Sequence, residues 1–262
     1  MRTPLIVLSN EVVKELRLFW SYKLTLLFEA ITLAFTFVGM CLFVGHGEFS
    51  RAYLIEALPA YLIWYYASRI LYDTGWRLAL EAQAGTLEQM MMAPVSSVLI
   101  LLARMIARMI ASSLLIIILG IILYVAIGAF PLFRPADLLV LLLTLIGVAG
   151  LGLVIGGCTL LVKQTPTFAA FISNVLLFFN GAILPIHLFP DWLEALARLL
   201  PTTLGIEILR KAIAAHTPIH ALFASGELTN LGLQSLVYLI AGWILYVLAE
   251  RIAKRLGTLG QY

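Results

Sequence analysis

Ionisable side chains inside apolar stretches are the strongest candidates for chemistry in this sequence. Arg69, Asp73, Arg77 and Glu81 follow one another at intervals of four residues. Residues four apart share one face of a helix, so opposite charges at this spacing can pair along that face. We expect this charge ladder to form ion pairs at its apolar end, because an isolated charge is costly in an apolar medium. The competing interpretation is a solvated helix end.

Two further carboxylates, Glu29 and Glu56, lie within or next to apolar stretches. A carboxylate at membrane depth is a functional hypothesis by default, for example as part of a proton path. The sequence offers one such group per stretch and no visible relay between them. A structural hydrogen bond or a headgroup contact is therefore favoured, and the role of both residues stays open.

The remaining reactive residues do not combine into a catalytic or metal-binding motif. His216 and His220 have a spacing that would suit a metal on a continuous helix, but Pro218 between them favours a plain interfacial role. Cys41 and Cys158 lie inside apolar stretches and are expected to be small core residues. The sequence has no recognisable hydrolase triad and no GxxxxGK[ST] motif for nucleotide phosphates. We expect no catalytic residue, metal or cofactor in this chain.

One polar stretch, residues 81–97 (EAQAGTLEQMMMAPVSS), lies between two long apolar runs. Gly85 should break the incoming helix, and the Thr86 hydroxyl can cap a new one. Glu88 would lie in its first turn, where the helix dipole favours a carboxylate. The apolar face of this short helix would comprise Leu87, Met90, Met91 and Pro94. Such a helix suits docking into a groove of a partner protein, and the alternative is a tight connection lying flat on the membrane.

The elements that carry these residues are predicted to be membrane helices. The 262 residues are 62% hydrophobic and only 12% charged, and the mean hydropathy is +1.03. Apolar stretches of about twenty residues, the length that crosses a bilayer, recur along the chain. The sequence therefore predicts an all-α polytopic membrane protein with a single transmembrane domain over residues 1–262. A net charge of +3 without a basic run does not suggest nucleic-acid binding.

Six transmembrane helices are expected. They lie at about 24–44, 53–80, 98–127, 138–162, 168–184 and 231–248. In the third, Arg104 and Arg108 lie one turn apart and can extend to lipid phosphates. The fourth contains glycines at three- and four-residue spacing, which predicts close helix packing rather than a site. These are Gly147, Gly150, Gly152, Gly156 and Gly157.

Two segments outside the spans are expected to be helical without crossing the bilayer. Residues 3–20 have apolar positions on one face and charged positions off it, which predicts an N-terminal interfacial helix. The apolar positions are Leu5, Leu8, Val12, Leu16 and Phe19, and the charged ones are Glu11, Lys14, Glu15 and Arg17. Residues 185–215 contain two helices too short to span, separated by Pro201, with Thr202 or Thr203 capping the second. They should form a re-entrant helical hairpin in one leaflet.

The distribution of Lys and Arg predicts the orientation. If the N-terminus is cytoplasmic, most Lys and Arg residues fall on the cytoplasmic side, as is usual in membrane proteins. We therefore expect a multi-pass protein of the cell membrane with both termini and residues 83–96 in the cytoplasm. The re-entrant hairpin then lies on the outer side.

The pattern E…GTLE…PVS between the second and third spans resembles the coupling helix of type-2 ABC exporter permeases. The matching residues are Glu81, Gly85, Thr86, Leu87, Glu88, Pro94, Val95 and Ser96, whereas Ala93 stands where Thr or Ser is common. The helix order and the LLPTTLGIEILR segment before the last span are also similar. In that family the coupling helix, which would be residues 83–96, sits in a cleft of the ATP-binding subunit. The resemblance thus implies an ATPase-binding site comprising Glu81, Gly85, Thr86, Leu87, Glu88, Met91 and Pro94.

By this resemblance the chain is the transmembrane subunit of an ATP-driven exporter and not an enzyme. It would work with a second permease copy, in a homodimer or with a related permease, and a separate ATP-binding subunit would hold ATP and Mg. The apolar spans favour a hydrophobic or amphipathic substrate: a drug, a lipid or a lipid-linked glycan. The main alternative is an ion-coupled secondary transporter, which would need paired repeats with interrupted helices. A membrane enzyme of lipid metabolism would need a polar catalytic cluster.

Overall fold

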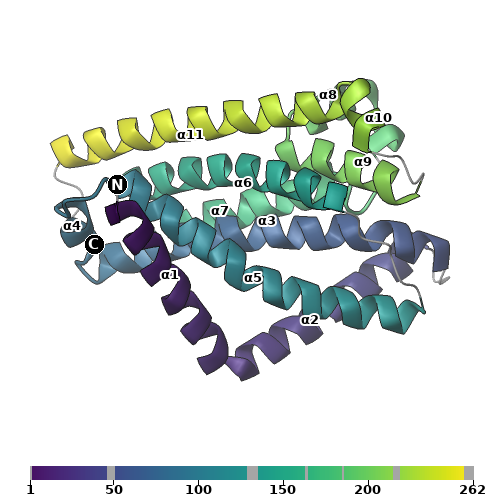
Figure 1. The fold of residues 1–262 in the computed structure, drawn as a ribbon, viewed down its shortest axis with the longest axis horizontal. Coiled ribbons are helices and arrows are strands. Elements are labelled where there is room, and N and C mark those ends of the chain that lie inside the picture. Colours follow the sequence, from purple (N-terminus) through teal and green to yellow (C-terminus); the bar gives the residue numbers. More distant parts are fainter. Residues whose placement is uncertain are drawn as a thin grey trace.

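The computed structural model describes residues 2–45, 51–128, 135–162, 165–184, 186–214 and 219–256, and in these ranges all regular structure is helical. The helices form an elongated bundle (Figure 1). They are α1 (Arg2–Ser21), α2 (Lys23–Val44), α3 (Arg51–Gln83), α4 (Leu87–Met91), α5 (Ser97–Ile127), α6 (Pro135–Leu161), α7 (Thr165–Phe179), the short 3-10 helix η1 (Ile186–Leu188), α8 (Asp191–Ala197), α9 (Pro201–Ala214), α10 (Ile219–Ala224) and α11 (Glu227–Leu256).

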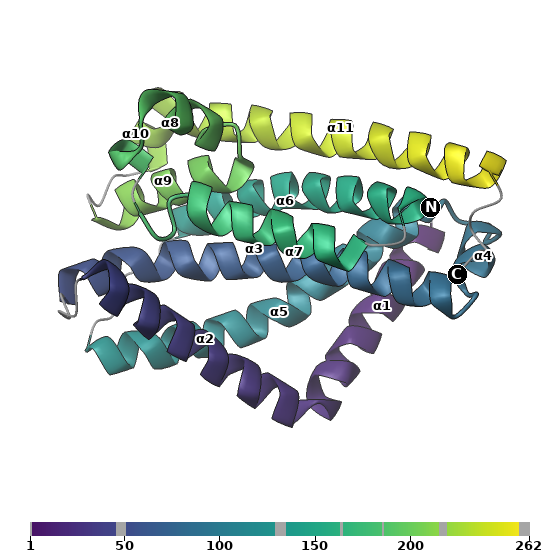
Figure 2. The same cartoon turned by 180° about the vertical axis from the view of Figure 1, so that it is seen from behind.

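Within the described residues, four helices are long and apolar enough to cross a membrane: α2, α5, α6 and α11. The other two expected spans differ from these in different ways. Helix α3 has 33 residues, about 50 Å of helix, but carries polar and charged side chains along its length. Helix α7 has 15 residues, about 22 Å, which is shorter than a hydrocarbon core of about 30 Å. Helix α3 packs against α2, α5 and α6, and α7 packs against α3 and α6 (Figure 2).

Helix α3 is the centre of the bundle. It packs against α5, α6, α7 and α9. Leu58, Tyr61, Ile70 and Leu71 on this helix are fully buried. Because protein covers much of α3, its sequence can tolerate polar side chains that a wholly lipid-facing helix could not.

The expected fifth span runs to about residue 184, but α7 ends at Phe179. The Asn180 side-chain oxygen accepts a hydrogen bond of 2.9 Å from the amide of Ala182. Gly181 has a φ of 79°, in the left-handed region that glycine enters without strain. The Asn-Gly pair therefore turns the chain and ends the helix early, a signal that the apolar pattern alone does not contain.

Helices α6 and α11 form the most extensive pairing in the described structure (Figures 1 and 2). A Cβ added at Gly150 of α6 would lie 2.4 Å from the backbone of Tyr238 on α11. One added at Gly242 of α11 would lie 2.2 Å from the Gly150 carbonyl oxygen. The two backbones therefore touch where the glycines meet, which confirms the packing role expected for the glycines of α6.

The two ends of the bundle are built differently. Helix α4, the first residues of α1 and the last residues of α11 lie at one end, and α8, α9 and α10 lie at the other (Figures 1 and 2). At the second end, side chains of α11 form hydrogen bonds with the two residues that follow α8. The Gln234 amide donates to the carbonyls of Arg198 (3.0 Å) and Leu199 (2.6 Å), and the Tyr238 hydroxyl donates to Leu199 (2.8 Å). These bonds satisfy carbonyls that a helix end leaves unpaired.

The segment expected as a re-entrant hairpin comprises η1, α8 and α9, two helices that are each too short to span. Capping by threonine was expected for the second helix, and this expectation is wrong. Helix α9 begins at Pro201, whose fixed φ suits a first helical position. Thr202 and Thr203 therefore lie inside its first turn, where both are fully buried. On α8, Trp192 and Leu196 are exposed at 66% and 53%.

Candidate functional site

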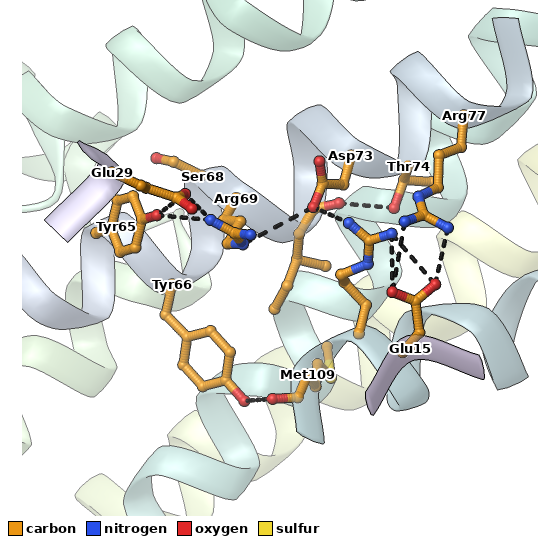
Figure 3. Close-up of polar contacts among 12 residues, drawn as sticks. Glu15, Glu29, Tyr65, Tyr66, Ser68, Arg69, Asp73, Thr74, Arg77 and Met109 are labelled. Carbon is orange, nitrogen blue, oxygen red and sulfur yellow. Dashed lines mark hydrogen bonds and ion pairs between the residues drawn. The ribbon is translucent and has the colours of Figure 1, made fainter. Parts of the chain in front are cut away.

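A network of ion pairs joins α1, α2, α3 and α5 (Figure 3). Its first part surrounds Arg69 of α3. Arg69 forms an ion pair with Glu29 of α2, and its Nη1 donates a 2.8 Å hydrogen bond to the Tyr65 hydroxyl, which itself donates to Glu29. The Arg69 Nε lies 3.9 Å from Oδ2 of Asp73. Glu29 is therefore the counter-charge of a partly buried arginine.

The second part joins three helices through Arg108 of α5 and Glu15 of α1. Arg108 forms an ion pair with Asp73, and its Nη2 lies 3.1 Å from Oε2 of Glu15. Glu15 also accepts from both terminal nitrogens of Arg77, at 2.7 and 3.4 Å. Only 5% of Glu15 is exposed, so this carboxylate lies between two guanidinium groups from different helices.

A third part surrounds Arg104, one turn before Arg108 on α5. Its Nη1 donates to the carboxylate of Glu81 at 2.8 Å and approaches the Met90 sulfur at 3.3 Å. Its Nε lies 3.4 Å from Oε1 of Glu11 on α1, and Glu11 also pairs with Lys14. One guanidinium thus contacts the end of α3, the short helix α4 and α1.

The network is balanced in charge. In its first two parts, the carboxylates of Glu15, Glu29 and Asp73 face the guanidinium groups of Arg69, Arg77 and Arg108. In the third, Glu11 and Glu81 face Arg104 and Lys14. Opposite charges in equal number make burial tolerable, since each ion that leaves water gains a partner. A cavity of about 30 Å³ among these side chains has room for a water molecule.

The ladder residues do not all pair with one another. Arg69 and Asp73 form the ladder's own ion pair, whereas Arg77 pairs with α1 and Glu81 with α5. The spacing of charges within α3 did not predict its partners on other helices. These counter-charges are Glu11, Glu15 and the two arginines of α5. The signal was available, because Glu11 and Glu15, like Arg104 and Arg108, repeat the four-residue spacing of the ladder.

Two expectations about these counter-charges need correction. Arg104 and Arg108 were expected to extend to lipid phosphates, but both turn inward to carboxylates. The charged residues of α1 were expected away from its buried face, but Glu11 and Glu15 face α5 and α3, and Leu5 is 68% exposed. The reason is electrostatic, because the partly buried arginines on α3 and α5 require carboxylates that those helices do not supply in full.

The short helix α4 follows a sharp turn at the end of α3. Gly85 has a φ of 70°, a left-handed conformation that ends α3 at low cost. Thr86 is the N-cap residue of α4, but its hydroxyl donates back to the Glu81 carbonyl (3.3 Å) and makes no capping bond. The expected side-chain cap is therefore absent at Thr86. Pro94 lies beyond Met91, where α4 ends.

The apolar face of α4 is used by the chain itself. Leu87 is 2% exposed and Met90 is 8% exposed, and both belong to the main hydrophobic core, against which Met91 also packs. The resemblance implies a docking site that includes Leu87 and Met91, and this stays a prediction; in the described structure Leu87 is buried in the core. The solvent-facing surface of α4 and its flanks, which we call the α4 outer face, comprises Thr86, Glu88, Gln89, Met92 and Pro94.

Other candidate residues lie apart from these features. Glu56 is exposed, in the second turn of α3. Cys41 is buried and Cys158 partly buried, and neither is in a disulfide. Among the residues that the structure describes, no group of three or more His, Cys, Asp or Glu side chains could hold a metal ion. His216 lies outside the described residues.

More than half of the chain matches a known protein family. The model of the family described as ABC-2 type transporter matches residues 74–214. The matched segment begins within α3, includes α4 to α8, and ends with α9. It therefore contains Arg77, Glu81, the α4 outer face and both arginines of the network on α5. No curated protein matches the chain.

Proposed function

Because the chain belongs to the ABC-2 type transporter family, whose model matches more than half of its length, we propose that it is the membrane subunit of an ATP-driven exporter. The family and the apolar helices make it a membrane-embedded, multi-pass permease with a transport role rather than a catalytic one. The family normally works with a separate ATP-binding subunit. Energy for transport would then come from ATP and Mg bound in that second chain.

We propose that the ATP-binding subunit docks on the α4 outer face. The observation that carries this proposal is the position of α4: a short helix at one end of the bundle, between α3 and α5, with its apolar side buried and its polar side free (Figure 1). Burial of Leu87 and Met90 fixes α4 to the core. A force on the exposed Glu88 side would therefore displace α3 and α5 together with α4.

The proposed direction and cargo follow from the same arrangement. The start of α1 and the end of α11 lie at the α4 end, which supports placing both termini and α4 in the cytoplasm and the hairpin of α8 and α9 outside (Figure 2). The apolar helices support a hydrophobic or amphipathic cargo such as a drug, a lipid or a lipid-linked glycan. A second permease copy would complete the pathway, with the hairpins of the two copies over its outer end.

Reversing one charge on the α4 outer face tests the docking proposal. Glu88→Lys places a cation where the exposed carboxylate of α4 stands, and we expect it to reduce recovery of the ATP-binding subunit with the tagged permease. Asp191→Lys is a matched control, since Asp191 is also an exposed acid in the first turn of a short helix, at the opposite end. Both variants should insert normally. Equal recovery with Glu88→Lys and the parent chain would refute docking through this face.

A further inference from the structure

The short helix α4 contacts the bundle through its buried apolar side chains and also through a charged side chain of α5. Arg104 of α5 approaches the Met90 sulfur at 3.3 Å with the same Nη1 that donates to Glu81 at 2.8 Å. Glu81 lies one turn before the Gly85 break, and Met90 lies within α4. The guanidinium therefore bridges the two sides of the turn that sets the direction of α4.

The third contact of Arg104 comes from α1. Its Nε lies 3.4 Å from Oε1 of Glu11, whose side chain is only 15% exposed. A guanidinium is planar and presents donors in a fixed fork, so holding two carboxylates fixes its orientation. Among the described residues, Glu11 has no hydrogen bond or ion pair with α4, so its link to α4 runs through Arg104.

We propose that Arg104 is a positioning residue for α4, and that through Glu11 the N-terminal helix α1 is part of the support of α4. This inference rests on the proposed function, because the position of α4 matters for transport only if the ATP-binding subunit docks there. The location of α4 relative to the bundle then depends on three helices, α1, α3 and α5. A displacement of α1 changes the presentation of the α4 outer face, although α1 itself need not contact the ATP-binding subunit.

The neighbouring Arg108 provides a matched control. It lies one turn away on the same helix, and it also bridges α1 and α3, through Glu15 and Asp73. Within the described part of the chain, Arg108 has no hydrogen bond or ion pair with α4. Arg104→Gln and Arg108→Gln thus remove the same charge from the same network, and only the first removes a contact with α4.

Hydrogen–deuterium exchange of the permease alone, read over residues 84–96, tests the inference. We expect Arg104→Gln to speed exchange in this segment by about tenfold or more, as for loss of a charge-assisted hydrogen bond. Arg108→Gln should speed exchange in α1 and leave residues 84–96 unchanged. Arg104→Lys, which keeps the charge but has a single nitrogen, should give an intermediate rate. If Arg104→Gln and Arg108→Gln speed the segment equally, or if neither does, Arg104 has no positioning role.

Glu11→Gln tests the part played by α1. It should speed exchange over residues 84–96 without touching α4, and no change there would remove α1 from the support. A second arm separates this inference from the docking proposal, because the exchange measurement needs no ATP-binding subunit. If Arg104→Gln loosens α4 but recovery of that subunit is unchanged, docking on α4 fails and the positioning role stands. Reduced recovery together with faster exchange supports both.

Discussion

Glu15 shows how much of this bundle depends on single charged side chains. It is a buried carboxylate on α1 that accepts from Arg77 of α3 and Arg108 of α5. Replacing a buried ion pair by apolar residues can be neutral, but removing one partner leaves the others buried and uncompensated. The stability of the α1–α3–α5 junction therefore depends on the completeness of the network.

This dependence predicts unequal effects for two glutamates that each pair with arginine. Glu15→Ala should lower the free energy of unfolding by about 1.5–3 kcal/mol, because among the described residues it leaves Arg77 without an ion-pair partner and Arg108 with Asp73 alone. Glu194→Ala should cost at most about 1 kcal/mol, since its partner Arg198 is 51% exposed. Thermal unfolding of the purified permease in one detergent measures both. Equal shifts in Tm would show that burial does not control the strength of these pairs.

At the scale of elements, helix positions followed from the sequence more readily than helix contacts. Apolar periodicity gave α2, α5 and α6 within a few residues, because a bilayer-crossing helix needs a long apolar run. The break at Gly85 also followed, since glycine is the residue that enters the left-handed region freely. The inward direction of Glu15 could not follow, because which face of an amphipathic helix is buried depends on charges supplied by other helices.

Because the backbones of α6 and α11 touch, we predict that adding one methyl group at their contact lowers stability. The same addition at an open position should be tolerated. Gly150→Ala should destabilise the chain by about 1–3 kcal/mol, because its Cβ would overlap the α11 backbone at Tyr238. Gly39→Ala on α2 is the control, since a Cβ there meets nothing within 4 Å. Alanine has the higher helix propensity, so this change should be neutral or slightly stabilising. A comparable loss of Tm in both variants would contradict backbone contact at Gly150.

At the scale of the whole molecule, the described structure contains two groups of helices connected through α3. Ion pairs join α1, α2 and α5 to α3, and close backbone packing joins α6 to α11 (Figures 1 and 3). Helix α3 contacts members of both groups along its length. A force applied at α4 enters the first group directly. It reaches the second through the packing of α3 on α6 and through α5, where the Ser97 hydroxyl donates to Glu250 of α11 at 2.6 Å.

The orientation of the whole molecule gives a prediction by chemical labelling. In a background without Cys41 and Cys158, Asp191→Cys and Lys211→Cys should react with an impermeant thiol reagent added to whole cells. Gln89→Cys on the α4 outer face should react only after permeabilisation. All three native side chains are exposed, so access within the fold does not limit the reaction. Reaction of the α8 and α9 positions from the cytoplasm alone would invert the topology and remove α4 from the ATPase side.

The backbone contact between α6 and α11 has a consequence for how the chain is made. These helices are partners in space, yet α7, α8, α9 and α10 separate them in the sequence. A ribosome at the membrane delivers α6 well before α11. In that interval the bare glycine face of α6 has no partner except lipid or another nascent helix. A chain stopped after α10 would therefore lack the helix against which Gly150 and Gly157 pack.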